Sequence, residues 1–295
     1  MLQRLKGAVR ARMGLDRVNA ALTTLALRAD EAERNIRDLQ PFSRVMAGTV
    51  TMEHTRYVAG TVVSIVMATR DRRDLLERAV GSVLRSAHEH WQLVIVDDGS
   101  TDGTADFLAT LDDARILVQR TEGVGAAAAR NVGLAHATGE WVAFLDDDNV
   151  IGQWWTKAIA EFGDRNPEAM AVYGGQLRQY EPGVGPSEWS YMLYIDPFDR
   201  PRLSNGNYID LGALAVRRAV DQLWFDPELR RFIDWEMVVR IAAQHDLHAL
   251  PVLTGVYFTR HDARITHTGR FDAWDEMGRR LRDIADPLGR PRPRP

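Results

Sequence analysis

Short apolar runs that alternate with helical segments restrict this 295-residue chain to few folds. The runs at residues 61–68 (TVVSIVMA), 92–96 (QLVIV) and 141–145 (WVAFL) are apolar almost throughout, as strands buried on both faces are. A further strand is expected at residues 115–119, and helical spacing fills the intervals. This alternation predicts an α/β fold with a doubly wound, mostly parallel sheet. Such sheets bind ligands beyond the carboxyl ends of their strands.

Polar side chains gather at those strand ends. They are Thr69, Arg70 and Asp71 after the first strand, Asp98 after the second, Arg130 in the helix before the fourth, and Asp146, Asp147 and Asp148 directly after the fourth. Three adjacent carboxylates repel one another, and Mg²⁺ or Mn²⁺ relieves the repulsion because these ions prefer oxygen ligands. The arginines balance the acids or contact a ligand. Taken alone, the triplet is better explained by a solvated acidic turn or by acids at a helix N-terminus than by a metal site.

Composition excludes several classes of site and partner. The chain has no cysteine, which excludes disulfides, thiolate zinc sites and cysteine nucleophiles. Its formal net charge of −4 gives no reason to expect nucleic acid as a partner. No stretch reaches the roughly 18 apolar residues of a membrane-spanning helix, and the first residues lack the apolar run of a secretory signal. The expected location is the cytoplasm. The basic first residues are either a solvated face or a peripheral contact with the inner face of the cell membrane.

Residues 1–40 are expected to form a separate helix. From Leu15 to Leu39 the apolar residues recur at alternating steps of three and four, which is a heptad pattern. Two interpretations remain open: a single helix packed on its own domain, or a coiled coil that makes a homo-oligomer through residues 15–39. Pro41 is expected to end this helix, and residues 41–60 to form a polar linker.

Three motifs together carry a resemblance to a known family. The segments VSIVMATRDRRDLLERAVGSVL, VIVDDGSTDGT and ARNVGLAHATGEWVAFLDDDN resemble the nucleotide-binding half of family 2 glycosyltransferases, which have the GT-A fold. The resemblance implies a nucleotide-sugar-binding half at residues 61–150 and an acceptor-binding half of the same domain at 151–262. Residues 207–210 (NYID) are similar to the segment before the acceptor site, and residues 189–201 are expected to be a loop with exposed aromatics. Residues 263–295 are expected to form an amphipathic helix and a disordered tail.

The resemblance also implies roles for individual residues. Asp234 matches the catalytic base of the family, although Ile233 stands where the family usually has Glu. Glu236 is the alternative base, and capping of the following helix is the structural alternative for Asp234.

At the donor, the resemblance assigns the divalent cation to Asp148 with Asp146 and His261, the ribose to Asp147 or Asp146, and the ring N–H of the base to Asp98. Because uracil offers such an N–H, a UDP-sugar is the favoured donor.

The expected function is inverting transfer of a sugar from a nucleoside-diphosphate sugar to a hydroxyl of a glycan, lipid-linked or other acceptor, in surface glycan or polysaccharide synthesis. A nucleotidyltransferase is the first alternative, but it calls for a Gly- and Lys-rich phosphate loop, and the first strand ends in TRDRRD. The second alternative is a non-catalytic nucleotide-sugar-binding or scaffold protein assembled through the coiled coil, which the changed Ile233 favours.

Overall fold

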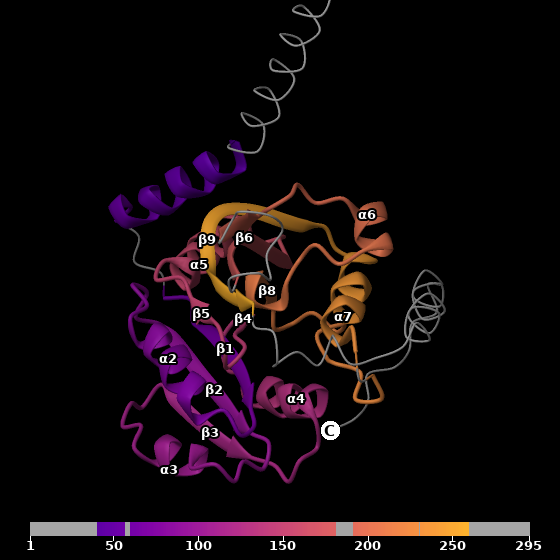
Figure 1. Cartoon of the computed structure of the whole chain (residues 1–295). Helices are drawn as coiled ribbons and strands as arrows, with labels where there is room; N and C mark the ends of the chain where they lie inside the picture. Colours follow the sequence, from indigo (N-terminus) through magenta and orange to yellow (C-terminus); the bar gives the residue numbers. More distant parts are fainter. Residues whose placement is uncertain (1–39, 57–59, 181–190, 230, 260–295) are drawn as a thin grey trace, which may run out of the picture. The chain divides into compact units, whose positions relative to one another are not determined.

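The computed structural model describes residues 40–56, 60–180, 191–229 and 231–259 (Figure 1). The heptad stretch at residues 15–39, His261 and the predicted C-terminal helix and tail lie outside the described residues. The chain divides into two compact units, Met1–Arg44 and Val45–Pro295. The second unit holds the sheet and all the described strand-end residues.

The first half of the sheet, formed within residues 61–150, has the predicted doubly wound arrangement. Its strands are β1 (Val63–Thr69), β2 (Trp91–Asp97), β3 (Ile116–Arg120) and β4 (Trp141–Phe144), and its helices are α2 (Arg73–Leu84), α3 (Thr104–Ala109) and α4 (Ala126–His136). These strands pair in parallel in the order β3-β2-β1-β4. Thr69 is opposite Asp97 in this register, and Val66 is opposite Phe144. The polar segments that follow β1, β2 and β4 therefore emerge at the same edge of the sheet, where these strands have their carboxyl ends.

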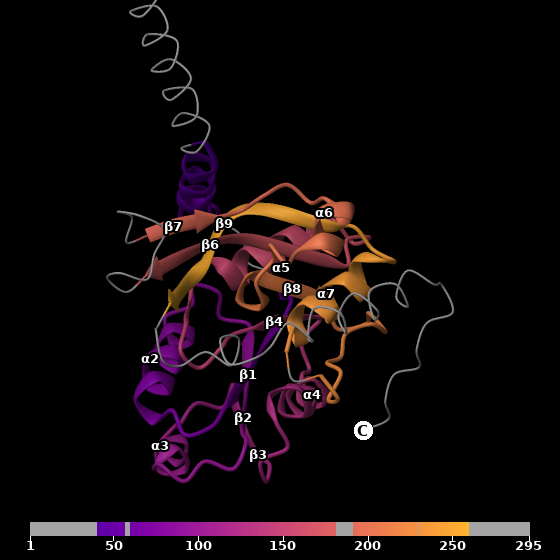
Figure 2. The same ribbon diagram turned by 45° about the vertical axis from the view of Figure 1, so that its right-hand side comes forward.

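The second half continues the same sheet with a different connectivity. Its elements are β5 (Val150–Ile151), α5 (Trp155–Arg165), β6 (Ala171–Tyr180), β7 (Tyr191–Tyr194), α6 (Arg200–Asn205), the 3₁₀ turn η1 (Leu211–Ala213), β8 (Leu214–Arg217), α7 (Ile233–Ala242) and β9 (Leu247–Thr259). Here β8 is antiparallel to β4 and β6, whereas the long, curved β9 is parallel to β6 (Figures 1 and 2). The sheet is thus parallel in the first half and mixed in the second.

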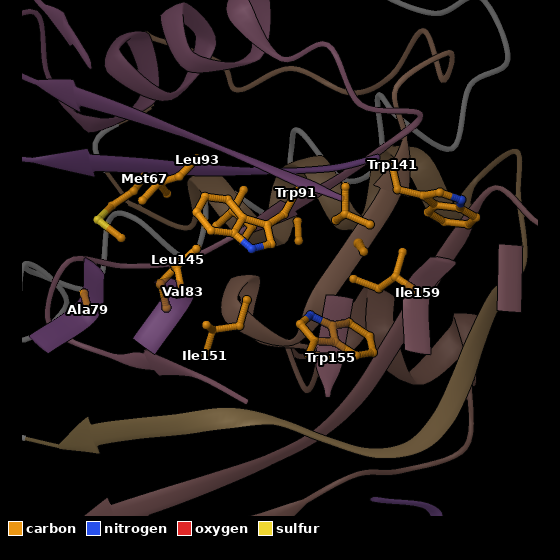
Figure 3. Close-up of a cluster of buried hydrophobic side chains, with 14 of the residues drawn as sticks. Met67, Ala79, Val83, Trp91, Leu93, Trp141, Leu145, Ile151, Trp155 and Ile159 are labelled. Carbon is orange, nitrogen blue, oxygen red and sulfur yellow. The ribbon is translucent and has the colours of Figure 1, made fainter. Parts of the chain in front are cut away.

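The side chains of each strand point alternately to the two faces of the sheet, and this divides the core into two layers. On one face, α2 and α5 cover the side chains of Val63, Ile65 and Met67, together with Trp91 and Trp141 (Figure 3). On the other face, α4 and α7 cover residues such as Val66, Val142 and Phe144. Because successive strand side chains point to opposite faces, apolar runs such as TVVSIVMA supply both layers at once.

Two sequence expectations outside the sheet core are wrong. Residues 40–54 are helical rather than a linker, because the helix has a buried face at Val45 and its last carbonyls are bound. Lys157 Nζ donates to the carbonyl oxygens of Met52 and Thr55, each at 2.6 Å. The aromatic segment at 189–201 is not only loop, since it contains β7, which pairs with β6.

Candidate active site

The triplet after β4 is held by two arginines and one threonine. Thr69 Oγ1 donates to Asp147 Oδ2 at 2.7 Å. Arg72 Nη1 donates to Asp147 Oδ1 at 3.0 Å and to Asp148 Oδ2 at 2.9 Å. Arg130 Nη2 donates to Asp146 Oδ1 at 2.7 Å. The structure therefore brings Thr69, Arg130 and the triplet together, as predicted from the strand ends.

Negative charge at the triplet is only partly compensated. Burial raises the pKa of Asp147 to about 6, against the opposing effects of Arg72 and the Thr69 hydroxyl. Burial and then the neighbouring Asp146 raise the pKa of Asp148 as well. A raised carboxyl pKa means that the ionised form is disfavoured, so a further cation at this place would be stabilising.

Asp98 shapes the loop between β3 and α4. Its Oδ1 accepts from Thr121 Oγ1 at 2.6 Å and from the amide of Val124 at 2.7 Å, and its Oδ2 accepts from the amide of Gly125 at 2.8 Å. Burial acts to raise the pKa of Asp98, but these hydrogen bonds outweigh it, so the pKa is lowered. Asp98 is thus ionised and anchors this loop. A nucleotide base that bound to Asp98 would have to share carboxylate oxygens that already accept hydrogen bonds from the loop.

Arg70 and Asp71 lie at the exposed rim of the same edge. Asp71 has a left-handed φ of 51° and accepts from the amide of Thr101 at 2.7 Å, which ties the turn after β1 to the turn after β2. The guanidinium of Arg70 approaches Gly123 so closely that a Cβ there would lie 3.0 Å from Nη1. Both residues therefore organise the loops at this end of the sheet.

The second half adds two more carboxylates to the site. Asn207 Nδ2 donates to Asp234 Oδ2 at 3.1 Å, and Asp234 is in the first turn of α7. Burial raises the pKa of Asp234, with Arg130 opposing and Asp146 adding to the increase. Asp210 interacts electrostatically with both Asp146 and Asp234. The candidate base, the triplet and Asp210 therefore converge, although Asp234 and Asp146 are far apart in the sequence.

Glu236 is not part of this convergence. Its two carboxylate oxygens accept from Arg240 Nε at 3.0 Å and Nη2 at 2.8 Å, and both side chains are buried. Arg240 in turn donates to the carbonyl oxygens of Gln222 and Trp224. The structure places Glu236 in an ion pair that fastens α7 to the preceding loop, with both oxygens engaged.

Sequence reasoning missed Arg72 and gave no individual role to Asn207 or Asp210. Arg72 could have been found, because it follows β1 by three residues and so lies at the ligand-binding edge. Among the described residues, no group of three or more His, Cys, Asp or Glu side chains is arranged to hold a metal ion. His261, the third ligand expected from the resemblance, lies outside the described residues.

Comparison with known proteins decides the family. The profile described as "Glycosyl transferase family 2" matches residues 64–224, which is more than half of the chain. The chain belongs to this family. As a family 2 glycosyltransferase it contains all three motifs that carry the resemblance, and the matched region extends from β1 to beyond β8.

Curated relatives match parts of the chain. The putative teichuronic acid biosynthesis glycosyltransferase TuaG of Bacillus subtilis is 47% identical over 91 residues, covering 30% of this chain and 36% of the relative. The succinoglycan biosynthesis protein ExoO of Rhizobium meliloti is 34% identical over 231 residues, covering 73% of this chain and 65% of the relative. The chain therefore spans about a third of the first relative's length and about two thirds of the second's.

Solved structures confirm the fold. The crystal structure of S. aureus TarS 1-349 in complex with UDP-GlcNAc superimposes with a TM-score of 0.62 at 18% identity, covering 75% of this chain and 66% of that chain. The predicted GT-A-type α/β fold of this family 2 glycosyltransferase is thereby confirmed. Within the described residues, no helix has both the length and the apolar character needed to cross a membrane.

Proposed function

We propose that this chain transfers a sugar from a nucleoside-diphosphate sugar, in the first place a UDP-sugar, to a hydroxyl acceptor in the synthesis of a cell-surface glycan. The observation that carries the proposal is the convergence of Asp234 with Asp146 and Arg130 across the two halves of the sheet. Relatives named for teichuronic acid and succinoglycan biosynthesis support the class of product. The neighbouring structure with UDP-GlcNAc supports the class of donor.

In this proposal, Asp234 accepts the proton of the acceptor hydroxyl as its oxygen attacks the anomeric carbon, and a single displacement inverts the configuration. A general base works best when its pKa lies close to the working pH, and burial moves the pKa of Asp234 in that direction. Asn207 holds one oxygen of Asp234 through its side-chain amide, which orients the carboxylate. Arg130 lies close enough to favour its ionised form.

The triplet fits a hard divalent cation in its chemistry. Its donors are all carboxylate oxygens, and burial raises the pKa values of Asp147 and Asp148, so a bound cation would stabilise their ionised forms. Asp146 and Asp148 would hold Mg²⁺ or Mn²⁺, with His261 as a further candidate, and the ion would stabilise the charge of the departing nucleoside diphosphate. Arg72 and Arg130, which now contact these carboxylates, lie where they can share that charge.

The second candidate is a non-catalytic nucleotide-sugar-binding or scaffold protein. It is favoured by Ile233, the first residue of α7, which is partly buried against the core at the position where the family usually has Glu. Assembly through residues 15–39 and a peripheral membrane contact are compatible with either candidate function, and both stay predictions.

One experiment separates the candidates. Release of UDP from UDP-glucose and UDP-GlcNAc is measured with the full chain in Mn²⁺, in Mg²⁺ and in EDTA, with UDP binding measured alongside. The transferase predicts turnover that EDTA removes. Tight UDP binding with no turnover in any condition supports the binding protein and overturns the enzyme.

A further inference from the structure

Beside Asp210, a pocket opens where β6 changes its neighbour. β8 pairs with β6 as far as Tyr173, and β7 pairs with it from Gln176 onward. The pocket between these two strands is lined by residues that include Tyr173, Gln176, Arg178, Tyr194, Tyr208 and Asp210. We call it the tyrosine pocket. It is lined by β6, β7 and the segment before η1, whereas the donor-binding strand ends belong to β1, β2 and β4.

Arg178 lies against two tyrosine rings at the tyrosine pocket. Its guanidinium carbon lies 4.4 Å from the ring centre of Tyr194 and 5.3 Å from that of Tyr257. The hydroxyl of Tyr194 is in turn 2.7 Å from that of Tyr180, which fixes the ring. Stacking of this kind orients the planar fork of an arginine without using its N–H groups.

The N–H groups of Arg178 are poorly used within the described part of the chain. Nε donates to Gln176 Oε1 at 3.4 Å, near the limit for a hydrogen bond, and Nη2 lies 3.8 Å from Asp210 Oδ2. Nη1 has no hydrogen-bond acceptor among the described residues. The side chain is 30% exposed, so these N–H groups remain accessible to water or to a ligand.

Two other stacked arginines among the described residues have a close carboxylate partner. Arg115 lies 3.7 Å from the ring centre of Trp91 and also donates to Asp113 Oδ2 at 2.7 Å. Arg202 lies 4.7 Å from the ring centre of Tyr208 and donates to Asp196 at 2.9 Å. Stacking alone therefore does not explain why Arg178 has only long contacts, with Gln176 and Asp210, within the described part of the chain.

Asp210 faces Arg178 through Oδ2, at 3.8 Å from Nη2, while its Oδ1 accepts from Gln176 Nε2 at 2.8 Å and from the amide of Gly212 at 3.0 Å. Asp210 also interacts electrostatically with Asp146 and Asp234. The tyrosine pocket and the candidate active site therefore share Asp210 as a neighbour.

We propose that Arg178 and the tyrosine pocket bind an oxyanion of the acceptor, so that the acceptor substrate carries a phosphate or a carboxylate. A planar guanidinium matches either group through two parallel N–H···O bonds. The tyrosine rings supply flat apolar surface for an adjacent sugar ring. This inference rests on the proposed function in identifying the bound molecule as the acceptor. The anion site itself is defined by the residues of the pocket alone. The two sources of the oxyanion are the diphosphate of a lipid-linked glycan and the carboxylate of an acidic sugar.

The test is equilibrium binding by calorimetry to the full chain with saturating UDP, so that the donor position is filled. Three probes are used: methyl diphosphate, methyl β-D-glucuronide and the matched neutral methyl β-D-glucoside. We expect at least one anionic probe to bind Arg178→Gln about tenfold or more weakly than wild type, while the glucoside shows no difference. A loss confined to methyl diphosphate indicates a lipid-linked diphosphate, and a loss confined to the glucuronide indicates an acidic sugar.

Two further variants keep the result decisive. Arg178→Lys keeps the charge but not the fork, and it should fall between wild type and Arg178→Gln. Arg115→Gln removes a stacked arginine far from the pocket and should bind all probes as wild type does. Unchanged UDP affinity in Arg178→Gln shows that the fold and the donor site survive. With UDP bound normally, equal affinity of wild type and Arg178→Gln for both anions overturns the inference. Failure of the proposed function appears separately, as absent turnover of UDP-sugars.

Discussion

Nη1 of Arg72 lies 3.0 Å from Oδ1 of Asp147, a carboxylate that is only 6% exposed at the end of β4. The same nitrogen also reaches Asp148. Arg72 thus acts as an internal counter-ion for two members of the triplet. It reaches them because β1 and β4 are neighbours whose carboxyl ends lie at the same edge.

Arg72→Gln should lower the free energy of unfolding by about 2 kcal/mol, because two partly or fully buried carboxylates lose a charged hydrogen-bond donor. Urea unfolding at pH 7 measures this. Arg73→Gln is the matched control, since Arg73 forms an exposed pair with Glu77 within α2 and lies 4.1 Å from the ring centre of Phe107, contacts worth about 1 kcal/mol. Equal stability of the two variants would contradict the role given to Arg72.

Stability should depend on pH through Asp210. Burial, together with Asp146, raises the pKa of Asp210 to about 6, from an ordinary value of 3.8. Between these values the folded state binds more protons than the unfolded state, so the free energy of unfolding falls as pH rises. Asp210→Asn removes this dependence while keeping the Oδ1 acceptor for Gln176 and Gly212.

Relative to wild type, Asp210→Asn should therefore gain stability between pH 4 and pH 7. The gain is up to about 3 kcal/mol, from about 1.4 kcal/mol for each unit of pKa. Urea unfolding of both proteins at unit pH steps tests it. If the two stability curves run parallel across this range, Asp210 is not the group responsible.

Asp234→Asn should slow sugar transfer roughly a hundredfold or more, because the amide cannot accept the proton of the attacking hydroxyl. UDP affinity should stay unchanged, since the contacts that hold the triplet are intact. The acidic limb of the wild-type pH–rate profile should lie above the ordinary range of a carboxyl group, as burial raises the pKa of Asp234. A variant with nearly wild-type turnover would remove Asp234 from the mechanism.

Glu236→Gln, in contrast to Asp234→Asn, should lose stability and keep its activity. Loss of the carboxylate leaves Arg240 buried with a neutral partner, so the free energy of unfolding should fall by about 3 kcal/mol. Turnover measured well below the unfolding temperature should stay within about threefold of wild type, because Glu236 does not face the acid cluster. Complete loss of activity in a folded Glu236→Gln protein would instead make Glu236 the base.

The sequence by itself determined the parallel half of the sheet and its ligand-binding edge. Runs such as TVVSIVMA are apolar at consecutive positions, and only a strand covered on both faces buries all of them. Once β1, β2 and β4 are parallel neighbours, Thr69, Asp98 and the triplet have to emerge at one edge. Chain order alone carries that information, so these donor-side residues were found without coordinates.

Only the tertiary structure decided the acceptor side. Antiparallel β8 and curved β9 bring α7 and the segment before η1 against that edge, and pairings between segments so distant in sequence leave no local pattern. The same packing gave Asp234 and Glu236, two residues apart on one helix, different surroundings. Asp234 faces Asn207 and the acids, whereas Glu236 is bound to Arg240. Side-chain direction on a helix is settled by what packs against each face, and a sequence motif does not specify that.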